Sequence, residues 1–147
     1  MTKLRNFFLL AVVMIASVTT LSSCGSDDDW DDGRFIDNRL NGYWELVESE
    51  GSPVYGQEVN YMLFDGNGTG LYYYWYRGRR YIDDLYYTSQ YSYGGASEYS
   101  LLLQYGNDRP TLVDYWFEGR NTLCMQWVAD GYGLVTYVYR RVPGAPW

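Results

Sequence analysis

The side chains that could do chemistry are few in this chain of 147 residues, which holds no histidine. Two carboxylate pairs, Asp83 with Asp84 and Glu48 with Glu50, are of the type that performs glycoside hydrolysis. Asp83 and Asp84 are neighbours in a strand-like run, so their side chains should point to opposite faces and cannot share a substrate. Glu48 and Glu50 share a face of their predicted strand, and we expect them only at the rim of the fold.

Other reactive groups lack the neighbours that catalysis needs. The sequence has no serine or cysteine nucleophile motif and no glycine-rich phosphate loop between a strand and a helix. Cys124 lies in a strand-like run, Thr122–Trp127, where we expect a small packed residue. The residues Asp65–Gly68 are similar to the start of a calcium loop but lack its downstream glutamate, so they predict a turn. We therefore expect no enzyme activity, no metal and no cofactor.

The motif Leu21-Ser22-Ser23-Cys24 follows an apolar run, Phe7–Val18, that is preceded by Lys3 and Arg5. An apolar run of about a dozen residues is too short for the roughly 20 that span a bilayer as a helix, so it predicts a removed signal. The motif resembles the lipobox of bacterial lipoproteins. The resemblance implies that residues 1–23 are a lipoprotein signal peptide and that Cys24 becomes the acylated first residue.

The expected membrane anchor is the lipid on Cys24, since each buried methylene contributes about 0.8 kcal/mol. Residues 25–33 hold five aspartates and resemble the acidic tag of surface-exported lipoproteins in some Gram-negative bacteria. These resemblances imply a protein of the bacterial cell envelope, lipid-anchored in the outer membrane and displayed on the surface. The alternatives are an ordinary secretory signal and a linker that faces the periplasm. Residues 24–37 predict an acidic, flexible tether.

The charge balance bears on the partners that the chain can bind. Without residues 1–23 the chain has nine arginines and eighteen aspartates and glutamates. Such an acid excess repels phosphate backbones, and no basic stripe offsets it, so we exclude nucleic acid as a partner. The remaining length of about 110 residues is enough for one hydrophobic core.

Short β-forming runs separated by turn residues fill the rest of the chain. The turns Asp65–Gly68, Gly106–Asp108 and Gly119–Asn121 consist of residues that tolerate positive φ. The expected strands are residues 43–50, 59–64, 69–76, 80–87, 98–105, 111–118, 122–128 and 134–141. Residues 88–97 fit a loop or an extra strand equally well.

The pattern within the runs predicts the fold class. Alternate positions of each run are largely apolar, and no helical period persists beyond the leader. Examples are Leu101, Leu103 and Tyr105, then Val113, Tyr115 and Phe117, and then Leu123, Met125 and Trp127. Short connections favour neighbouring hairpins, and closure removes exposed sheet edges. We therefore predict an all-β fold, an antiparallel up-and-down meander of about eight strands that forms a closed or nearly closed barrel. The barrel should span residues 38–142, followed by a C-terminal tail, 143–147.

Gly42 and Trp44 form a Gly-x-Trp motif at the start of the first predicted strand, and Phe64–Gly70 forms a glycine-rich hairpin. These features resemble lipocalin-like proteins of the calycin group. The resemblance implies that Trp44 plugs the closed end of the barrel and that an arginine on or after the last strand covers its ring. Arg140 and Arg141 are both candidates, and strand parity does not choose between them.

The density of aromatic residues is highest in Leu71–Tyr76 and between Tyr81 and Tyr93. If Phe64 faces inward and a four-residue loop follows it, one set of side chains on the next strand points inward and the other outward. The expected inward set is Thr69, Leu71, Tyr73 and Trp75, and the expected outward set is Tyr72, Tyr74 and Tyr76.

Two functions follow from this arrangement. The first is a non-enzymatic, lipid-anchored binding protein for a small apolar or amphipathic molecule, with the ligand lined by Tyr73, Trp75, Tyr115 and Trp127. The alternative is a surface interaction lipoprotein whose barrel is filled by bulky side chains. Such a protein would bind a glycan or a protein through its outer tyrosines, Tyr72, Tyr74 and Tyr76, helped by Arg77, Arg79 and Arg80. The presence of an internal cavity would favour the first function.

Overall fold

The structure of the protein is a computed structural model that describes residues 33–92, 97–129, 131 and 133–146. Cys24, the expected signal peptide 1–23 and residues 24–32 of the expected tether lie outside the described residues. Within the described ranges, no helix is long and apolar enough to span a membrane.

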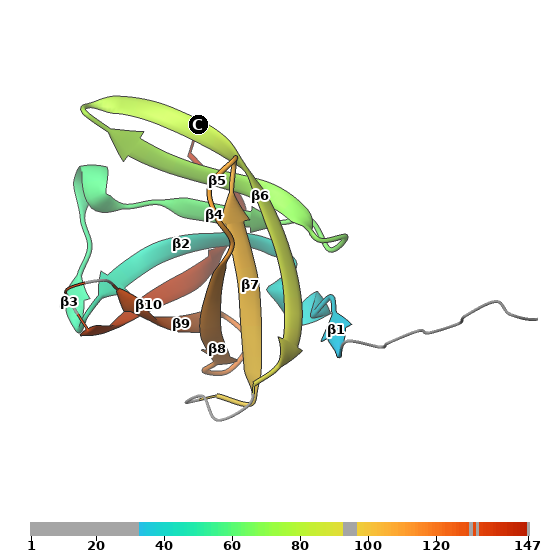
Figure 1. The fold of residues 1–147 in the computed structure, drawn as a ribbon. Helices are drawn as coiled ribbons and strands as arrows, with labels where there is room; N and C mark the ends of the chain where they lie inside the picture. The colour runs from blue at the N-terminus through green and yellow to red at the C-terminus, as the bar shows by residue number, and fades with distance from the viewer. Residues whose placement is uncertain (1–32, 93–96, 130, 132, 147) are drawn as a thin grey trace, which may run out of the picture. The chain divides into compact units, whose positions relative to one another are not determined.

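Eight antiparallel strands of the described chain close into a barrel (Figure 1). Each strand pairs with the next along the chain, and the last strand pairs with the first, as the up-and-down prediction requires. The strands are β2 (Gly42–Ser49), β4 (Tyr61–Phe64), β5 (Thr69–Tyr76), β6 (Arg79–Tyr91), β7 (Tyr99–Tyr105), β8 (Thr111–Phe117), β9 (Thr122–Ala129) and β10 (Gly133–Val142). The predicted all-β meander barrel is therefore confirmed.

Four short elements decorate the barrel. Strand β1 (Arg34–Phe35) pairs with β6, and β3 (Ser52–Pro53) pairs with β2. The 3-10 helix η1 (Asn38–Leu40) precedes β2, and η2 (Gly56–Glu58) precedes β4. Because β1 and the residue that caps η1 belong to the fold, the barrel domain takes in the last residues of the range expected to be a tether.

The longest strand, β6, runs to Tyr91 and so absorbs the start of the segment 88–97, for which the sequence allowed a loop or a strand. Residues 93–96 of that segment lie outside the described residues. Figure 1 shows the β5–β6 hairpin projecting from the barrel body, with β6 then bending down along β7. This one strand therefore extends from the hairpin tip to the opposite end of the barrel.

The core lies inside the barrel and consists of alternate residues of each strand. This alternation follows from the two-residue period of a strand, which turns every second side chain inward. The fully buried members include Leu101 and Leu103 of β7, Tyr115 of β8, and Leu123 and Met125 of β9. These positions are the apolar faces that alternation in the sequence predicted.

The side chains of β5 face the opposite way from the sequence expectation. Phe64 pairs with Gly70, and Met62 with Tyr72, so Tyr72 shares the inner face with Met62 and packs against the core. The connection after Phe64 thus has five residues, 65–69, rather than four. One added residue reverses every side chain that follows. The expected inward set of Thr69, Leu71, Tyr73 and Trp75 therefore faces outward, and the expected outward set of Tyr72, Tyr74 and Tyr76 follows the inner face.

The five-residue turn is held by its own side chains. Asp65 Oδ1 accepts hydrogen bonds from the backbone N–H of Asn67 at 3.1 Å and of Thr69 at 3.2 Å. The N–H of Gly66 donates to Tyr87 Oη at 2.9 Å, which ties the turn to β6. A Cβ on Gly70 would lie 1.8 Å from the carbonyl oxygen of Leu63, so only glycine fits where the chain leaves this turn.

Candidate functional site

The closed end of the barrel is sealed by Trp44 of β2. Its side chain is fully buried, and its Nε1–H donates to the carbonyl oxygen of Leu40 at 2.6 Å. Leu40 ends η1, so this bond fixes the short helix across the end of the barrel. The ring of Phe117 packs beside Trp44 with 5.9 Å between the ring centroids. The apolar surface of the indole is therefore packed, and its one polar atom has a hydrogen-bond partner.

Arg141, rather than Arg140, covers the ring of Trp44. Its Cζ lies 4.3 Å from the ring centroid, and Arg141 is the direct strand partner of Trp44. The guanidinium donates to the carbonyl oxygens of Asn41, of Arg39 at 2.6 Å and of Arg120 at 3.3 Å. Arg140 points to the other side and pairs with Glu45 at 2.5 Å. Arg141 thus joins η1, the β8–β9 turn and the end of β10.

A buried carboxylate completes the closed end. Asp37 accepts a hydrogen bond from Tyr115 Oη at 2.9 Å and pairs with Arg39 at 2.6 Å. Tyr115 Oη also lies 3.1 Å from Ser89 Oγ. Burial alone would raise the pKa of Asp37, but the hydrogen bonds from Arg39 and Tyr115 outweigh burial and hold the pKa below its usual value. The ionised carboxylate therefore locks the N-terminal segment to the barrel wall.

The open end holds a cavity of about 110 Å³. It lies where β7 ends and β8 begins, at the far end of these strands from Trp44. Burial raises the pKa of Tyr105 and of Tyr139, so both hydroxyls stay protonated at a more alkaline pH than that of an exposed tyrosine. The lining is mainly apolar and consists of Leu103, Tyr105, Thr111, Val113, Met125, Trp127 and Tyr139.

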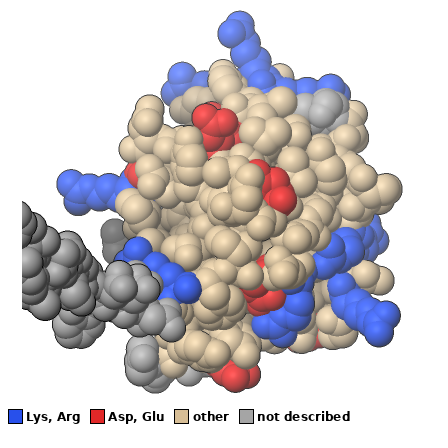
Figure 2. All heavy atoms as spheres, turned by 90° about the vertical axis from the view of Figure 1, so that its right-hand side faces the viewer, with Lys and Arg blue, Asp and Glu red and all other residues tan. Residues whose placement is uncertain are grey.

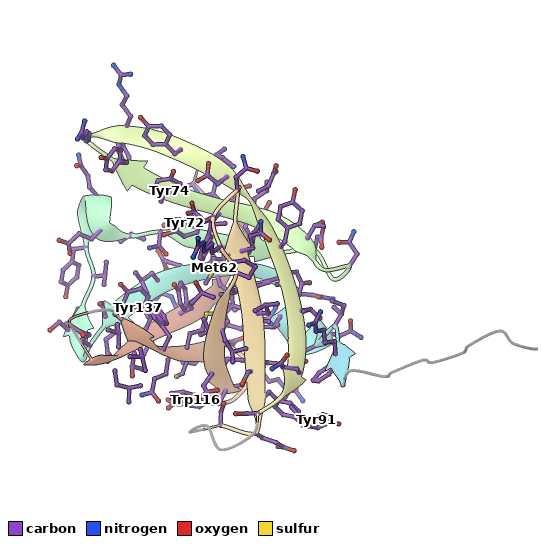
Figure 3. The ribbon with its side chains drawn as sticks, in the orientation of Figure 1. Met62, Tyr72, Tyr74, Tyr91, Trp116 and Tyr137 are labelled. Atoms are coloured by element: carbon purple, nitrogen blue, oxygen red, sulfur yellow. The ribbon has the colours of Figure 1, made fainter. Side chains whose placement is uncertain are left out.

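A row of tyrosines leads from this cavity to the projecting hairpin. Tyr72 packs on the cavity residue Tyr105 at 4.6 Å between ring centroids, and Tyr74 stacks on Tyr72 at 5.0 Å. Tyr81 of β6 stacks on Tyr74 in turn, at 5.5 Å. Figure 3 shows Tyr72 and Tyr74 one after the other along the hairpin, on its side toward Met62. The row ends at Tyr76, which is 54% exposed.

The structure brings only part of the expected ligand lining together. Trp127 lines the open-end cavity and packs edge-on against Tyr137 at 4.6 Å. Tyr115 faces inward but lies at the closed end, where Asp37 uses its hydroxyl. Tyr73 is buried on the outer face beside Tyr43, and Trp75 lies under the guanidinium of Arg80. Tyr73 and Trp75 are therefore not cavity residues.

Strand parity already places two further lining residues inside the barrel, although the sequence did not mark them as part of the ligand lining. Tyr105 has the same parity as Leu101 and Leu103, and Met125 the same parity as Trp127, so their inward position is a local property of the sequence. The contact of Asp37 with Tyr115 joins residues 78 positions apart. No local pattern signals that contact.

The remaining candidates for chemistry are separated from one another. Asp83 accepts a hydrogen bond from Tyr74 Oη at 2.9 Å, whereas Asp84 pairs with Leu71 on the opposite face, as the sequence predicted. Cys124 is buried, and burial together with the nearby Glu118 raises the pKa of its thiol to about 11. A thiol with this pKa is protonated at neutral pH, which agrees with the predicted packed residue. Across the described ranges, no three histidine, cysteine or acidic side chains gather where they could hold a metal ion.

The class that the fold and these ends define is a closed, eight-stranded antiparallel barrel, with one end sealed by a tryptophan–arginine stack and the other hollowed by a small apolar cavity. No protein-family model matches the chain, and no curated protein is significantly similar to it.

Proposed function

We propose that this domain is a lipocalin-like, non-enzymatic binding protein that takes an apolar group of a small molecule into the open end of its barrel. The observation that supports this function best is the 110 Å³ cavity beside Trp127. The stack of Arg141 on Trp44 at the other end supports the lipocalin-like assignment, since the two residues occupy the positions that the resemblance implies.

The cavity volume limits the ligand. An engineered apolar cavity of about 150 Å³ accepts benzene, so the cavity here suits a group of similar size or smaller. Pockets for whole drug-sized molecules are about 300 Å³ or more. The ligand is therefore either very small or amphipathic, with one apolar end in the cavity. Its remaining part would lie at the rim, near Thr111 and along the tyrosine row.

Thr111→Phe tests this function, because Thr111 is an exposed residue that lines the cavity. A ring at this rim position should close the entrance with little effect on stability. We expect benzene or toluene to change the tryptophan emission of the parent protein with a saturable dependence, and Thr111→Phe to weaken that binding at least about tenfold, which is about 1.4 kcal/mol.

Leu112→Phe is the matched control, since Leu112 adjoins Thr111 but is exposed on the other face of β8. It should leave the titration unchanged. An equal loss in both variants, or the absence of saturable binding of any compound in a panel of small apolar molecules and short fatty acids, would refute the proposal.

We further propose that Cys24 carries the lipid that anchors this domain to the outer membrane of a bacterial cell. The support is the lipobox-like motif and the charged start before its apolar run. Cys24→Ala should abolish incorporation of labelled palmitate and release the protein from membranes. Membrane association that persists in Cys24→Ala, with no label in the parent protein, would exclude a lipid anchor.

A second candidate function rests on the tip of the β5–β6 hairpin. Tyr76 and Tyr81 are exposed there, and Arg77 lies over the ring of Tyr76 at 5.1 Å. Exposed tyrosines with adjacent arginines suit stacking on a sugar ring or contact with a protein. The largely filled barrel interior favours such an outer surface over a large internal ligand.

The double substitution Tyr76→Ser and Tyr81→Ser separates this candidate from the cavity. On a glycan array, binding that is lost in the double variant and kept in Tyr55→Ser would support the hairpin surface. Tyr55 is a suitable control because it is 74% exposed and lies outside the hairpin. Toluene binding that is unchanged in the double variant would show that ligand binding in the cavity does not depend on the hairpin tip.

A further inference from the structure

A second hollow lies at the closed end of the barrel, outside the Trp44 seal. It has a volume of about 390 Å³, within the range of small-molecule pockets. Three arginines line it, Arg39 of η1, Arg120 of the β8–β9 turn and Arg141 of β10, together with Phe117, Gly119 and Asn121. Figure 2 views the molecule from the side on which β1 lies and shows arginine side chains mainly near the edges of a largely uncharged surface, with a few acidic side chains between them.

The positive charge of this groove is only partly neutralised. Arg39 pairs with Asp37. The hydrogen bonds of Arg141 go to backbone carbonyl oxygens, which leave its full charge in place. Arg120 is exposed, and in the described part of the chain no carboxylate pairs with Arg120 or Arg141. Two uncompensated guanidinium groups therefore face the same hollow.

The two uncompensated arginines differ in the contacts that hold their guanidinium groups. Arg141 is fixed by the ring of Trp44 beneath it and by three carbonyl oxygens around it. Arg120 lies at the rim, and within the described residues its guanidinium makes no hydrogen bond or ion pair, so its N–H groups are available to a ligand. A fixed cation lowers the entropy cost of binding, and a free arginine can form two parallel hydrogen bonds with a carboxylate or phosphate.

One wall of the groove is apolar. Phe117 lines it, and the ring is held by Trp44 at 5.9 Å, by Tyr115 at 5.9 Å and by the Cζ of Arg39 at 4.8 Å. A rigid aromatic wall beside cationic groups suits a ligand that has a flat apolar part next to its charge.

We propose that this groove binds a small organic anion, a carboxylate or a phosphate monoester attached to a flat apolar group. Arg120 and Arg141 hold the anionic group, and Phe117 packs on the apolar part. The site lies at the opposite end of the barrel from the apolar cavity and does not depend on a ligand there.

Titrations of the full chain with benzoate and with phenyl phosphate, followed by amide chemical shifts, test the site and distinguish the two anionic groups. We expect saturable shifts at Gly119, Arg120 and Asn121 for at least one probe. Neutral benzyl alcohol, with the same ring, should not shift them. Arg120→Gln should weaken binding at least about fivefold, because it removes hydrogen bonds to a charged group.

Arg109→Gln is the matched control, since Arg109 is another exposed arginine and the change in net charge is the same. It should leave the affinity nearly unchanged. Equal weakening in both variants would mean that the anions respond only to net charge, and equal binding of benzyl alcohol would mean that the groove is merely apolar. Either result, or the absence of saturable shifts with both anions, overturns the proposal.

Discussion

The two ends of the barrel are closed by different physical means. At the closed end, Trp44, Arg141 and Asp37 are joined by hydrogen bonds and a charge pair to η1 and the barrel wall. At the open end, the rings of Tyr105 and Trp127 line a residual cavity, and Tyr72 packs on the ring of Tyr105. Hydrogen-bonded charged groups allow one geometry, whereas packed rings can shift to admit another apolar group.

This difference indicates that one end of the barrel contributes mainly to stability and the other mainly to binding. Specific polar bonds at the closed end join η1 and the β8–β9 turn to the end of β10, and so they reinforce the closure that the β2–β10 pairing makes. The open end leaves space unfilled, at a cost to stability that a bound apolar group would recover. Substitutions at the closed end should therefore affect stability, and substitutions at the open end should mainly affect binding.

The largest effect should come from Trp44→Ala. This substitution removes a fully buried ring together with its hydrogen bond to Leu40, and we expect the free energy of unfolding to fall by about 3 to 5 kcal/mol. Trp127→Ala, at the half-buried cavity wall, should cost about 1 to 2 kcal/mol. Urea unfolding followed by circular dichroism measures both changes. Equal losses in the two variants would show that the ends contribute alike.

The second effect concerns the two neighbouring arginines. Arg141→Gln leaves the carbonyl oxygens of Arg39, Asn41 and Arg120 without their donor and should lower the free energy of unfolding by about 2 to 3 kcal/mol. Arg140→Gln breaks only an exposed ion pair with Glu45 and should cost less than about 1 kcal/mol. Thermal unfolding of both variants measures the two losses of stability. A larger loss for Arg140→Gln would contradict the assignment of the seal.

The sequence predicts the strands and their order but does not predict which of the two arginines covers Trp44. Turn residues and apolar alternation are local signals, so they predicted eight strands and a closed meander. The β2–β10 pairing has an irregularity between Val138 and Tyr139, just before the two arginines, which counting along the strand does not reveal. In the same way, the direction in which the β5 side chains point depends on the length of the loop before β5. That loop has a fifth residue, Thr69, whose N–H donates a hydrogen bond to Asp65.

The volume of the cavity also could not be predicted from the sequence. Parity placed Trp127, Met125 and Leu103 inside the barrel, but the space left between them depends on the rotamers of Tyr105 and Tyr139. The closed-end network was missed for a different reason. Asp37 lies in a stretch that composition assigns to a tether, and its partner Tyr115 is distant in the chain.

The pH dependence of stability should differ between the ends, beginning with Asp37. Because its pKa is lower in the folded than in the unfolded state, it contributes stability above the unfolded value of about 3.9, and the contribution is lost as pH falls through the folded pKa. Asp37→Asn should cost about 1 to 2 kcal/mol at pH 7, and its deficit should shrink below about pH 4. Urea unfolding at pH 7 and pH 3 tests this expectation. A deficit that is constant with pH would mean that the charge of Asp37 contributes nothing.

The smallest effect, absent at neutral pH, should appear at the open end in alkali. Burial raises the pKa of Tyr72 to about 12, with the neighbouring tyrosines adding to the shift. A group whose folded pKa is raised stabilises the fold below its unfolded pKa, and this contribution falls as pH rises toward the folded pKa. The parent protein should therefore lose about 1 kcal/mol per pH unit between about pH 10 and 12 from this side chain. Tyr72→Phe keeps the ring, so its stability should match the parent at pH 8 and exceed it at pH 11. Tyr55→Phe is the exposed control, and its stability should follow that of the parent at both pH values. If the stability of Tyr72→Phe also follows that of the parent, the hydroxyl of Tyr72 lies in water rather than against Tyr105.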